Sequence, residues 1–333
     1  MLAVAAVLLA PVVACDQHLS KTFPPDKPGA AVAVVRHGAV LLARGYGLAD
    51  VAAKSPVTRR TAFDLASCSK QFTAAAVGRL IDQEKLSPDD DVRKWLPGVP
   101  CLDPARPVRV RDLLQQTSGL PEYFAWVNPD DPAEFAASTN ADVLARLAAS
   151  KPERRPGEAH VYTNTNYVVL AELVRAVSGT SLREFLHAEL FAPLGMADTR
   201  VCDAVPFEVP DRASGYSGGK PARLDGPIHG DGNVFTTLDD LLRWDAAWTA
   251  GRVLKPATQR AAWTSGALDD GKPCGYGWGW VVDRRGVWHN GQWAGTKTMV
   301  LRTAGGVSVL VLCCDDRGPA EATAFRLARL AGR

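Results

Sequence analysis

Ser67 and Lys70 are the two residues of this sequence whose types and spacing best suit catalysis. The segment Ser67-Cys68-Ser69-Lys70 opens a stretch with helical periodicity, and residues three apart on a helix share one face. The Ser67 hydroxyl and the Lys70 amine can therefore meet within hydrogen-bonding reach. A serine alone is a weak nucleophile, but a neutral lysine beside it can accept its proton. The positive helix N-terminus favours both the neutral lysine and a developing anion.

Two later segments could complete such a site. Tyr162-Thr163-Asn164 follows a turn and precedes a second helical stretch. A tyrosine can relay protons, and an asparagine can hold a substrate amide. His289-Asn290-Gly291 lies on a predicted strand, where backbone N–H groups could stabilise an oxyanion and a glycine lets a substrate approach closely. Taken singly, Tyr162-Thr163-Asn164 would be turn residues and His289 would be a structural histidine. Only the combination of these segments with Ser67 and Lys70 favours a site.

Together, and in this order, the three segments resemble those of the serine β-lactamase and penicillin-binding-protein superfamily. The resemblance is closest to its class C branch, which includes esterases, D-aminopeptidases and D-alanyl-D-alanine carboxypeptidases. That branch carries S-x-x-K, Y-x-N and then K-T-G or H-x-G. Other stretches that look like the family's run from Pro28 towards the C-terminus. They are residues 28–35, 45–47, 63–67, 70–73, 112–114, 117–121, 230–232 and 236–237.

The resemblance implies an acyl-enzyme mechanism that needs no cofactor. Lys70, helped by Tyr162, would deprotonate Ser67, which would then attack a carbonyl carbon. Tyr162 would protonate the leaving group and later activate water or another acceptor.

The same resemblance implies how a substrate would be held. The backbone N–H groups of Ser67 and Gln292 would form the oxyanion hole, with Gly291 beside them. Asn164 would orient the acyl group. His289 would form a polar wall, able to carry positive charge, on the side of the leaving group.

We therefore expect a serine hydrolase of esters, small amides or D-amino-acid peptides. The alternatives are a β-lactamase or D-alanyl-D-alanine carboxypeptidase, and a non-catalytic penicillin-binding sensor. Class C β-lactamases usually have lysine where His289 stands, and a neutral imidazole holds a carboxylate less strongly than an ammonium group. Gln116 stands where many relatives have histidine, and Asn233 replaces a common glycine. Both are expected to lie apart from the three segments and to affect specificity.

Apolar periodicity predicts an α+β fold of the β-lactamase/transpeptidase-like type. An antiparallel sheet from both termini is flanked by helices and carries an inserted, mostly helical lobe. The domain is expected over about residues 20–333, with a sheet lobe at about 20–90 and 272–333 and a helical lobe at about 91–271. Strands are predicted at residues 30–35, 39–44, 276–283, 287–289, 296–302 and 307–313. Helices are predicted at residues 67–86, 112–115, 141–149, 167–177, 182–190, 239–250 and 321–330.

The N-terminal 15 residues resemble an export signal. Residues 2–14 carry no charge and are too few to span a bilayer as a helix, which is typical of a signal-peptide core. Small residues before Cys15 are similar to a bacterial lipobox, and the alternative is simple cleavage after Ala14. No basic residue precedes the apolar run. We expect an exported protein that is periplasmic, anchored in a membrane through lipid on Cys15, or secreted.

Other features exclude competing functions. The net charge of +2 gives no clustered positive field, so we expect a small-molecule partner and neither nucleic acid nor direct membrane binding. The six histidines form no H-E-x-x-H motif, and no metal site is expected.

The segment around Ser217 matches G-x-S-x-G, but a nucleophile elbow needs a strand before it and a helix after it. Loop-like residues flank this segment on both sides, so Ser217 is not expected to be the nucleophile.

Overall fold

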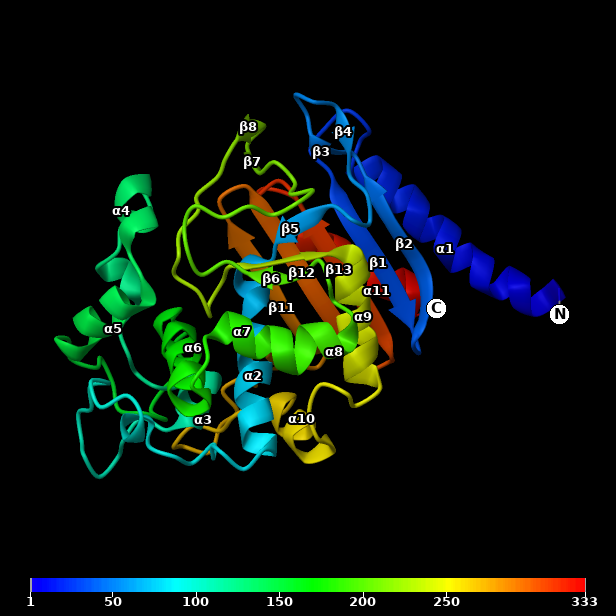
Figure 1. Ribbon diagram of the computed structural model, residues 1–333. Helices are drawn as coiled ribbons and strands as arrows, with labels where there is room; N and C mark the ends of the chain where they lie inside the picture. The colour runs from blue at the N-terminus through cyan, green and yellow to red at the C-terminus, as the bar shows by residue number, and fades with distance from the viewer. Residues whose placement is uncertain (1, 333) are drawn as a thin grey trace.

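A six-stranded antiparallel sheet forms the centre of the fold in the computed structural model, which describes residues 2–332 (Figure 1). The strand order β10-β11-β12-β13-β1-β2 joins the two ends of the chain, with β1 paired to β13 from Ala30↔Cys313 to Arg36↔Val307. The antiparallel sheet from both termini is therefore confirmed. Its strands are β1 (Ala30–Arg36), β2 (Ala39–Tyr46), β10 (Val281–Asp283), β11 (Gly286–Trp293), β12 (Thr296–Thr303) and β13 (Val307–Cys313).

Both faces of this sheet are covered because the neighbouring strands β13 and β1 are mostly apolar on both faces. Successive side chains of a strand point to opposite faces. Ala31 and Ala33 of β1 join the large core on the helical side, while Val32 and Val34 join a second core on the other side. A strand buried on both faces is expected to be a continuous apolar run, as the sequence of β1 is.

The second core lies under two helices from opposite ends of the chain, α1 (Leu2–Thr22) and α11 (Ala320–Ala331). Leu19 of α1 and Leu327 of α11 are completely buried there. Figure 1 shows α1, in blue, beside β2 with its N-terminal end projecting away from the sheet. Within residues 2–332, no helix is both long enough and apolar enough to cross a membrane.

The opposite face carries the elements that present Ser67 and Lys70. They are the 3₁₀ turn η1 (Ala66–Ser69), α2 (Lys70–Asp82) and α9 (Leu238–Thr249). The prediction that the first helix continues to residue 86 is wrong. Glu84 takes a left-handed φ of 59°, and the Lys85 N–H reaches back to the Leu80 carbonyl, which ends the helix.

Most of the other helices and turns lie between β2 and β10 in sequence. The helices are α3 (Val110–Leu114), α4 (Pro132–Ala137), α5 (Asn140–Ala148), α6 (Thr165–Ser178), α7 (Leu182–Leu186), α8 (Ala192–Leu194) and α10 (Pro256–Ala262). Two 3₁₀ turns are η2 (Val92–Lys94) and η3 (Tyr123–Ala125), and η4 (His187–Phe191) is a π-helical segment. The short strands are β3 (Leu48–Asp50), β4 (Ser55–Pro56), β5 (Ala62–Asp64), β6 (Arg200–Val201), β7 (Tyr216–Ser217), β8 (Lys220–Pro221) and β9 (Val234–Thr237).

The strand expected at residues 276–283 is present only at its end, as β10. Gly275 and Gly279 take left-handed φ angles of 77° and 76°, which bend the chain out of an extended conformation. The resulting loop crosses the start of α2 so closely that a Cβ on Gly279 would lie 2.8 Å from the Lys70 carbonyl oxygen. The glycines thus let this loop cover Lys70.

Candidate active site

Ser67 and Lys70 meet as their spacing predicts. Ser67 lies in η1 and Lys70 is the first residue of α2, so the two lie one turn apart although the α-helix proper begins only at Lys70. The Lys70 Nζ lies 3.1 Å from the Ser67 Oγ. Lys70 is completely buried, whereas Ser67 is partly exposed. The hydroxyl is thus open to a substrate while the amine is shielded from water.

Two further oxygens fix the position of the Lys70 amine. The Nζ donates hydrogen bonds to Asn164 Oδ1 at 2.8 Å and to the Asp231 carbonyl at 2.9 Å. Both oxygens can only accept hydrogen bonds, and a neutral amine has two N–H groups and one lone pair. With those two N–H groups engaged, the lone pair of a neutral Lys70 faces the Ser67 hydroxyl. The geometry therefore suits transfer of the serine proton to Lys70.

Asn164 is oriented by Glu122, a residue that the sequence analysis missed. Glu122 Oε2 accepts hydrogen bonds from the Asn164 backbone N–H at 2.8 Å and from Asn164 Nδ2 at 3.2 Å. These contacts turn Asn164 Oδ1 towards Lys70. Burial raises the pKa of the Glu122 carboxyl, and the Asn164 N–H opposes that shift. The signal was available, because Glu122 directly follows the family-like stretch at residues 117–121.

Gln116 does not lie apart from the catalytic segments, and that expectation is corrected. Its Oε1 accepts a hydrogen bond from the Thr163 backbone N–H at 3.1 Å and one from Asn166 Nδ2 at 2.6 Å. Its own carbonyl accepts the Val161 N–H at 3.0 Å. Gln116 is completely buried and thus supports the turn that carries Tyr162 and Asn164.

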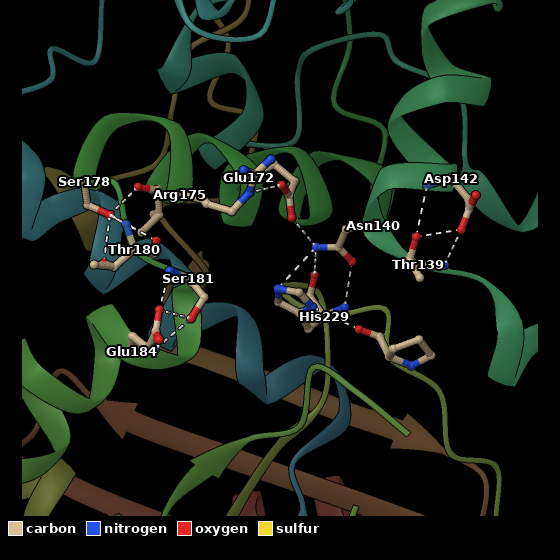
Figure 2. A network of polar contacts seen from close by, with 12 residues as sticks. Thr139, Asn140, Asp142, Glu172, Arg175, Ser178, Thr180, Ser181, Glu184 and His229 are labelled. Carbon is tan, nitrogen blue, oxygen red and sulfur yellow. Dashed lines mark hydrogen bonds and ion pairs between the residues drawn. The ribbon is translucent and has the colours of Figure 1, made fainter. Parts of the chain in front are cut away.

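A buried polar network holds the loop that supplies the Asp231 carbonyl. Figure 2 shows Asn140, at the start of α5, between His229 and Glu172 of α6. Asn140 Nδ2 donates to Glu172 Oε1 at 3.1 Å and to the His229 carbonyl at 3.2 Å, and its Oδ1 accepts the His229 N–H at 3.0 Å. Asn140 therefore ties both helices to the chain two residues before Asp231.

Tyr162 approaches Lys70 through its aromatic face. The Lys70 Nζ lies 4.9 Å from the ring centroid, within cation–π distance. The rings of Tyr276 and His289 lie 6.2 Å and 6.1 Å away, and Tyr162 is 41% exposed. Within residues 2–332 its hydroxyl makes no hydrogen bond, so the structure brings the ring to Lys70 without a direct bond to Ser67.

His289 is a neutral wall of the site, and the expectation that it could carry positive charge is corrected. Burial, together with the charge of a protonated Lys70, lowers its pKa from 6.5 to about 3. Its Nδ1 lies 2.6 Å from the Asn290 carbonyl, which can only accept, so Nδ1 carries the proton. Its Nε2 then accepts the Tyr276 hydroxyl at 2.8 Å. Tyr276 was expected to pack in a strand, and it instead fixes this tautomer.

The neutrality of His289 predicts how stability depends on pH. Below about pH 6.5 the unfolded chain binds this proton and the folded protein does not, so falling pH destabilises the folded state by up to about 1.4 kcal/mol per pH unit. His289→Gln removes this contribution and should reduce the stability lost between about pH 7 and pH 5 by about 1–2 kcal/mol. Urea unfolding at both pH values measures the difference. An imidazole NMR titration of His289 centred near pH 6.5 would contradict the assignment.

Gly291 allows β11 to lie directly against the nucleophile. A Cβ at this position would lie 2.3 Å from the Leu65 carbonyl and 3.0 Å from the Ser67 backbone nitrogen. The Cys68 thiol donates to the His289 carbonyl at 3.1 Å, a second contact between η1 and the strand. Gln292, the next residue, is exposed and lines a pocket together with Ser67.

That pocket, about 130 Å³ in volume, has both aromatic and acidic residues in its lining. Ser67 and Asn164 line it with the apolar side chains Phe124, Phe135 and Trp293. The lining also includes two acidic residues, Asp64 and Asp231. Burial raises the pKa of both, to about 6 for Asp64, while the charge of Lys70 opposes the shift at Asp231.

The model of the family described as Beta-lactamase matches residues 22–333 of this sequence. The chain belongs to the Beta-lactamase family. The family resemblance drawn from the three segments is thereby confirmed. Among its relatives, penicillin-binding protein 4* of Bacillus subtilis is 32% identical over 290 residues, which is 80% of this chain and 63% of that protein. A D-aminopeptidase of Brucella anthropi is 29% identical over 328 residues, 95% of this chain and 61% of that enzyme.

A solved structure similar to this chain supports the fold. The octameric penicillin-binding protein homologue from Pyrococcus abyssi has a TM-score of 0.82 at 25% identity, covering 97% of this chain and 78% of that one. The β-lactamase/transpeptidase-like fold is thus confirmed. The chain spans only 61–63% of the length of the two relatives named above.

Proposed function

We propose that this protein is a serine hydrolase that forms an acyl-enzyme on Ser67 and cleaves amides, small peptides or esters. The observation that carries the proposal is the Lys70 Nζ, 3.1 Å from the Ser67 Oγ and held by two acceptors on its other sides. A buried lysine so placed is an activating base for a serine nucleophile.

The reaction begins when Lys70 accepts the Ser67 proton and the Ser67 oxygen attacks the carbonyl carbon. The N–H groups of Ser67 and Gln292 stabilise the oxyanion that forms. As the intermediate collapses, the bond to the leaving group breaks and Tyr162 supplies the leaving group's proton. In deacylation, Tyr162 takes a proton from water, and the water oxygen attacks the acyl carbon. The bond from that carbon to the Ser67 oxygen then breaks, Lys70 returns its proton to Ser67, and the acid is released.

The lining of the pocket indicates the acyl part of the substrate. Phe124, Phe135 and Trp293 suit an apolar or aromatic side chain, and Asn164 lies where it can bind a polar group near the carbonyl. Asp231 and Asp64, which also line the pocket, suit a positively charged amino group. We propose amides and peptides with a free α-amino group as the preferred class. The name of the Brucella relative, a D-aminopeptidase, favours the D configuration.

A second candidate is a β-lactamase or D-alanyl-D-alanine carboxypeptidase, which the penicillin-binding relative favours. The neutral His289 argues against efficient use of substrates whose carboxylate must be held by a cation. The third candidate, a non-catalytic sensor, is disfavoured because Ser67, Lys70 and Tyr162 are all present around one site.

A panel of substrates tests these candidates with the full chain. D-Phenylalanine amide should be hydrolysed faster than its N-acetyl derivative, by roughly 10–100-fold in kcat/KM, because hydrogen bonds to charged groups contribute about 1.5–3 kcal/mol. p-Nitrophenyl acetate should be hydrolysed, and nitrocefin slowly or not at all. Mass spectrometry of the quenched reaction should find the acyl group on the peptide that contains Ser67.

Other outcomes of the panel would overturn the proposal. Nitrocefin as the fastest substrate would establish the second candidate. Stoichiometric acylation without turnover would establish the sensor. Equal rates for the amide and its N-acetyl derivative would contradict only the role given to Asp64 and Asp231, which is to bind the substrate's amino group.

We also propose export, with processing near Cys15. The support is the uncharged run at residues 2–14 and the small residues before Cys15. Cys15 is only 2% exposed under the sheet, so lipid on its sulfur would require α1 to leave this position. Intact-mass measurement of membrane and soluble fractions distinguishes a lipidated Cys15, simple cleavage after Ala14 and an unprocessed chain. The unprocessed chain in the cytoplasm would contradict export.

A further inference from the structure

Ala66, the residue before the nucleophile, has an unusual backbone conformation. Its φ is 47°, in the left-handed region that L-residues other than glycine, asparagine and aspartate rarely adopt. Ala66 is buried and begins η1, so its conformation sets the direction in which the chain presents Ser67. Such conformations persist only where neighbouring groups enforce them, and they cluster at functional sites.

The carboxylate of Asp64 is the group in contact with this turn. Its Oδ1 accepts the Ala66 backbone N–H at 2.8 Å. Asp64 ends β5 and pairs with Phe235 of β9, while its own carbonyl accepts the Thr296 hydroxyl at 3.0 Å. The backbone of Asp64 is therefore held on two sides, and its side-chain carboxylate accepts the hydrogen bond from the turn at Ala66.

The residue between them is anchored independently. The Leu65 N–H donates to the Val234 carbonyl at 2.9 Å, and the Leu65 carbonyl accepts the Thr298 hydroxyl at 2.8 Å. Loss of the Asp64 carboxylate would leave these bonds in place. Its effect should be confined to the turn at Ala66 and Ser67.

We infer that Asp64 is a positioning residue, whose carboxylate holds Ala66 in the left-handed turn that aims the Ser67 hydroxyl at Lys70 and the acyl pocket. The inference rests on the proposed function, because it assigns Ser67 as the nucleophile. It assigns Asp64 a role in acylation that is separate from its place in the pocket wall.

Three variants test this role with p-nitrophenyl acetate, an uncharged ester that has no amino group for Asp64 and Asp231 to bind. Asp64→Ala should lower kcat by roughly 10–100-fold with little change in KM, since small misplacements of reacting groups cost about 100-fold. Asp64→Asn keeps an oxygen acceptor and should stay within about threefold of wild type, because the acceptor and not the charge holds the N–H. Asp64→Ala combined with Ala66→Gly should recover most of the lost kcat, because glycine adopts a positive φ without help.

Asp50 provides the matched control. Its Oδ1 also accepts a backbone N–H, from Ala53 at 2.7 Å, in an exposed turn outside the pocket. Asp50→Ala should leave kcat unchanged. Circular dichroism and thermal unfolding confirm that each variant is folded before its rate is compared.

Three outcomes would overturn the inference, and a fourth bears on the proposed function. Wild-type kcat in Asp64→Ala, or a double variant no faster than the single one, would overturn it. A large loss in Asp64→Asn on the uncharged ester would also overturn it, and this readout stands even if Asp64→Ala does not fold. Absence of turnover in the wild-type protein on every ester and amide would instead refute the proposed function.

Discussion

Ser67→Ala is expected to lower kcat/KM by about 10⁴-fold or more, because loss of a nucleophile removes the covalent pathway entirely. Acylation by fluorescent penicillin or by an activated ester should disappear with it. The fold should persist, since Ser67 is partly exposed and its hydroxyl bonds only to Lys70 among the described residues. Steady-state kinetics and mass spectrometry of the quenched enzyme measure both losses.

Cys68 cannot replace the missing hydroxyl in that variant. Burial raises the pKa of its thiol to about 12, and the thiol donates to the His289 carbonyl. A thiolate is the reactive form of cysteine, so Cys68 stays inert near neutral pH. Residual turnover above the uncatalysed rate would therefore come from binding and oxyanion stabilisation alone.

Ser217→Ala is the matched control for the Ser67 variant. Ser217 lies in the two-residue strand β7, and the chain then turns at Gly218 and Gly219 with φ angles of 58° and 80° into β8. No helix follows, so the geometry of a nucleophile elbow is missing, as the sequence predicts. Activity that survives Ser67→Ala and is lost in Ser217→Ala would show that Ser217 is the nucleophile.

The pairing of Ser67 with Lys70 was predictable because a single helical turn fixes it. The sheet strands were predictable for a similar reason, since apolar runs such as residues 30–35 of β1 and 309–313 of β13 must be buried on both faces. Contacts between distant segments needed the family resemblance. The spacing of residues along the chain does not predict that the Tyr162 ring centroid lies 4.9 Å from the Lys70 Nζ.

Other parts of the site had no sequence signal of their own. The Asp231 carbonyl that holds Lys70 is a backbone atom, so the residue type at that position does not reveal it. The neutrality of His289 depends on its burial beneath Tyr276, which is a property of the folded core. Burial and backbone acceptors are tertiary features, and for this reason the electrostatics of the site could not be predicted from residue types.

Lys70→Met is expected to lower kcat/KM by roughly 10²–10⁴-fold, the usual contribution of general acid–base catalysis. Methionine has a similar length but cannot accept the Ser67 proton. It also leaves Asn164 Oδ1 and the Asp231 carbonyl without the donor that both now have, so the Asn164 side chain is held only by Glu122. Stopped-flow measurement of the acylation step should find the loss there, with slower appearance of the acyl-enzyme.

Lys272→Met is the matched control for that variant, because Lys272 is exposed and pairs only with Asp270 on the surface among the described residues. It should change neither kcat nor KM. If Lys70 acts as the base, raising the pH should not restore Lys70→Met to the wild-type rate, since the proton acceptor itself is gone. An exogenous primary amine small enough to enter the vacated space should restore part of the acylation rate. Wild-type acylation in Lys70→Met would instead mean that Tyr162, whose ring faces the same amine, is the base.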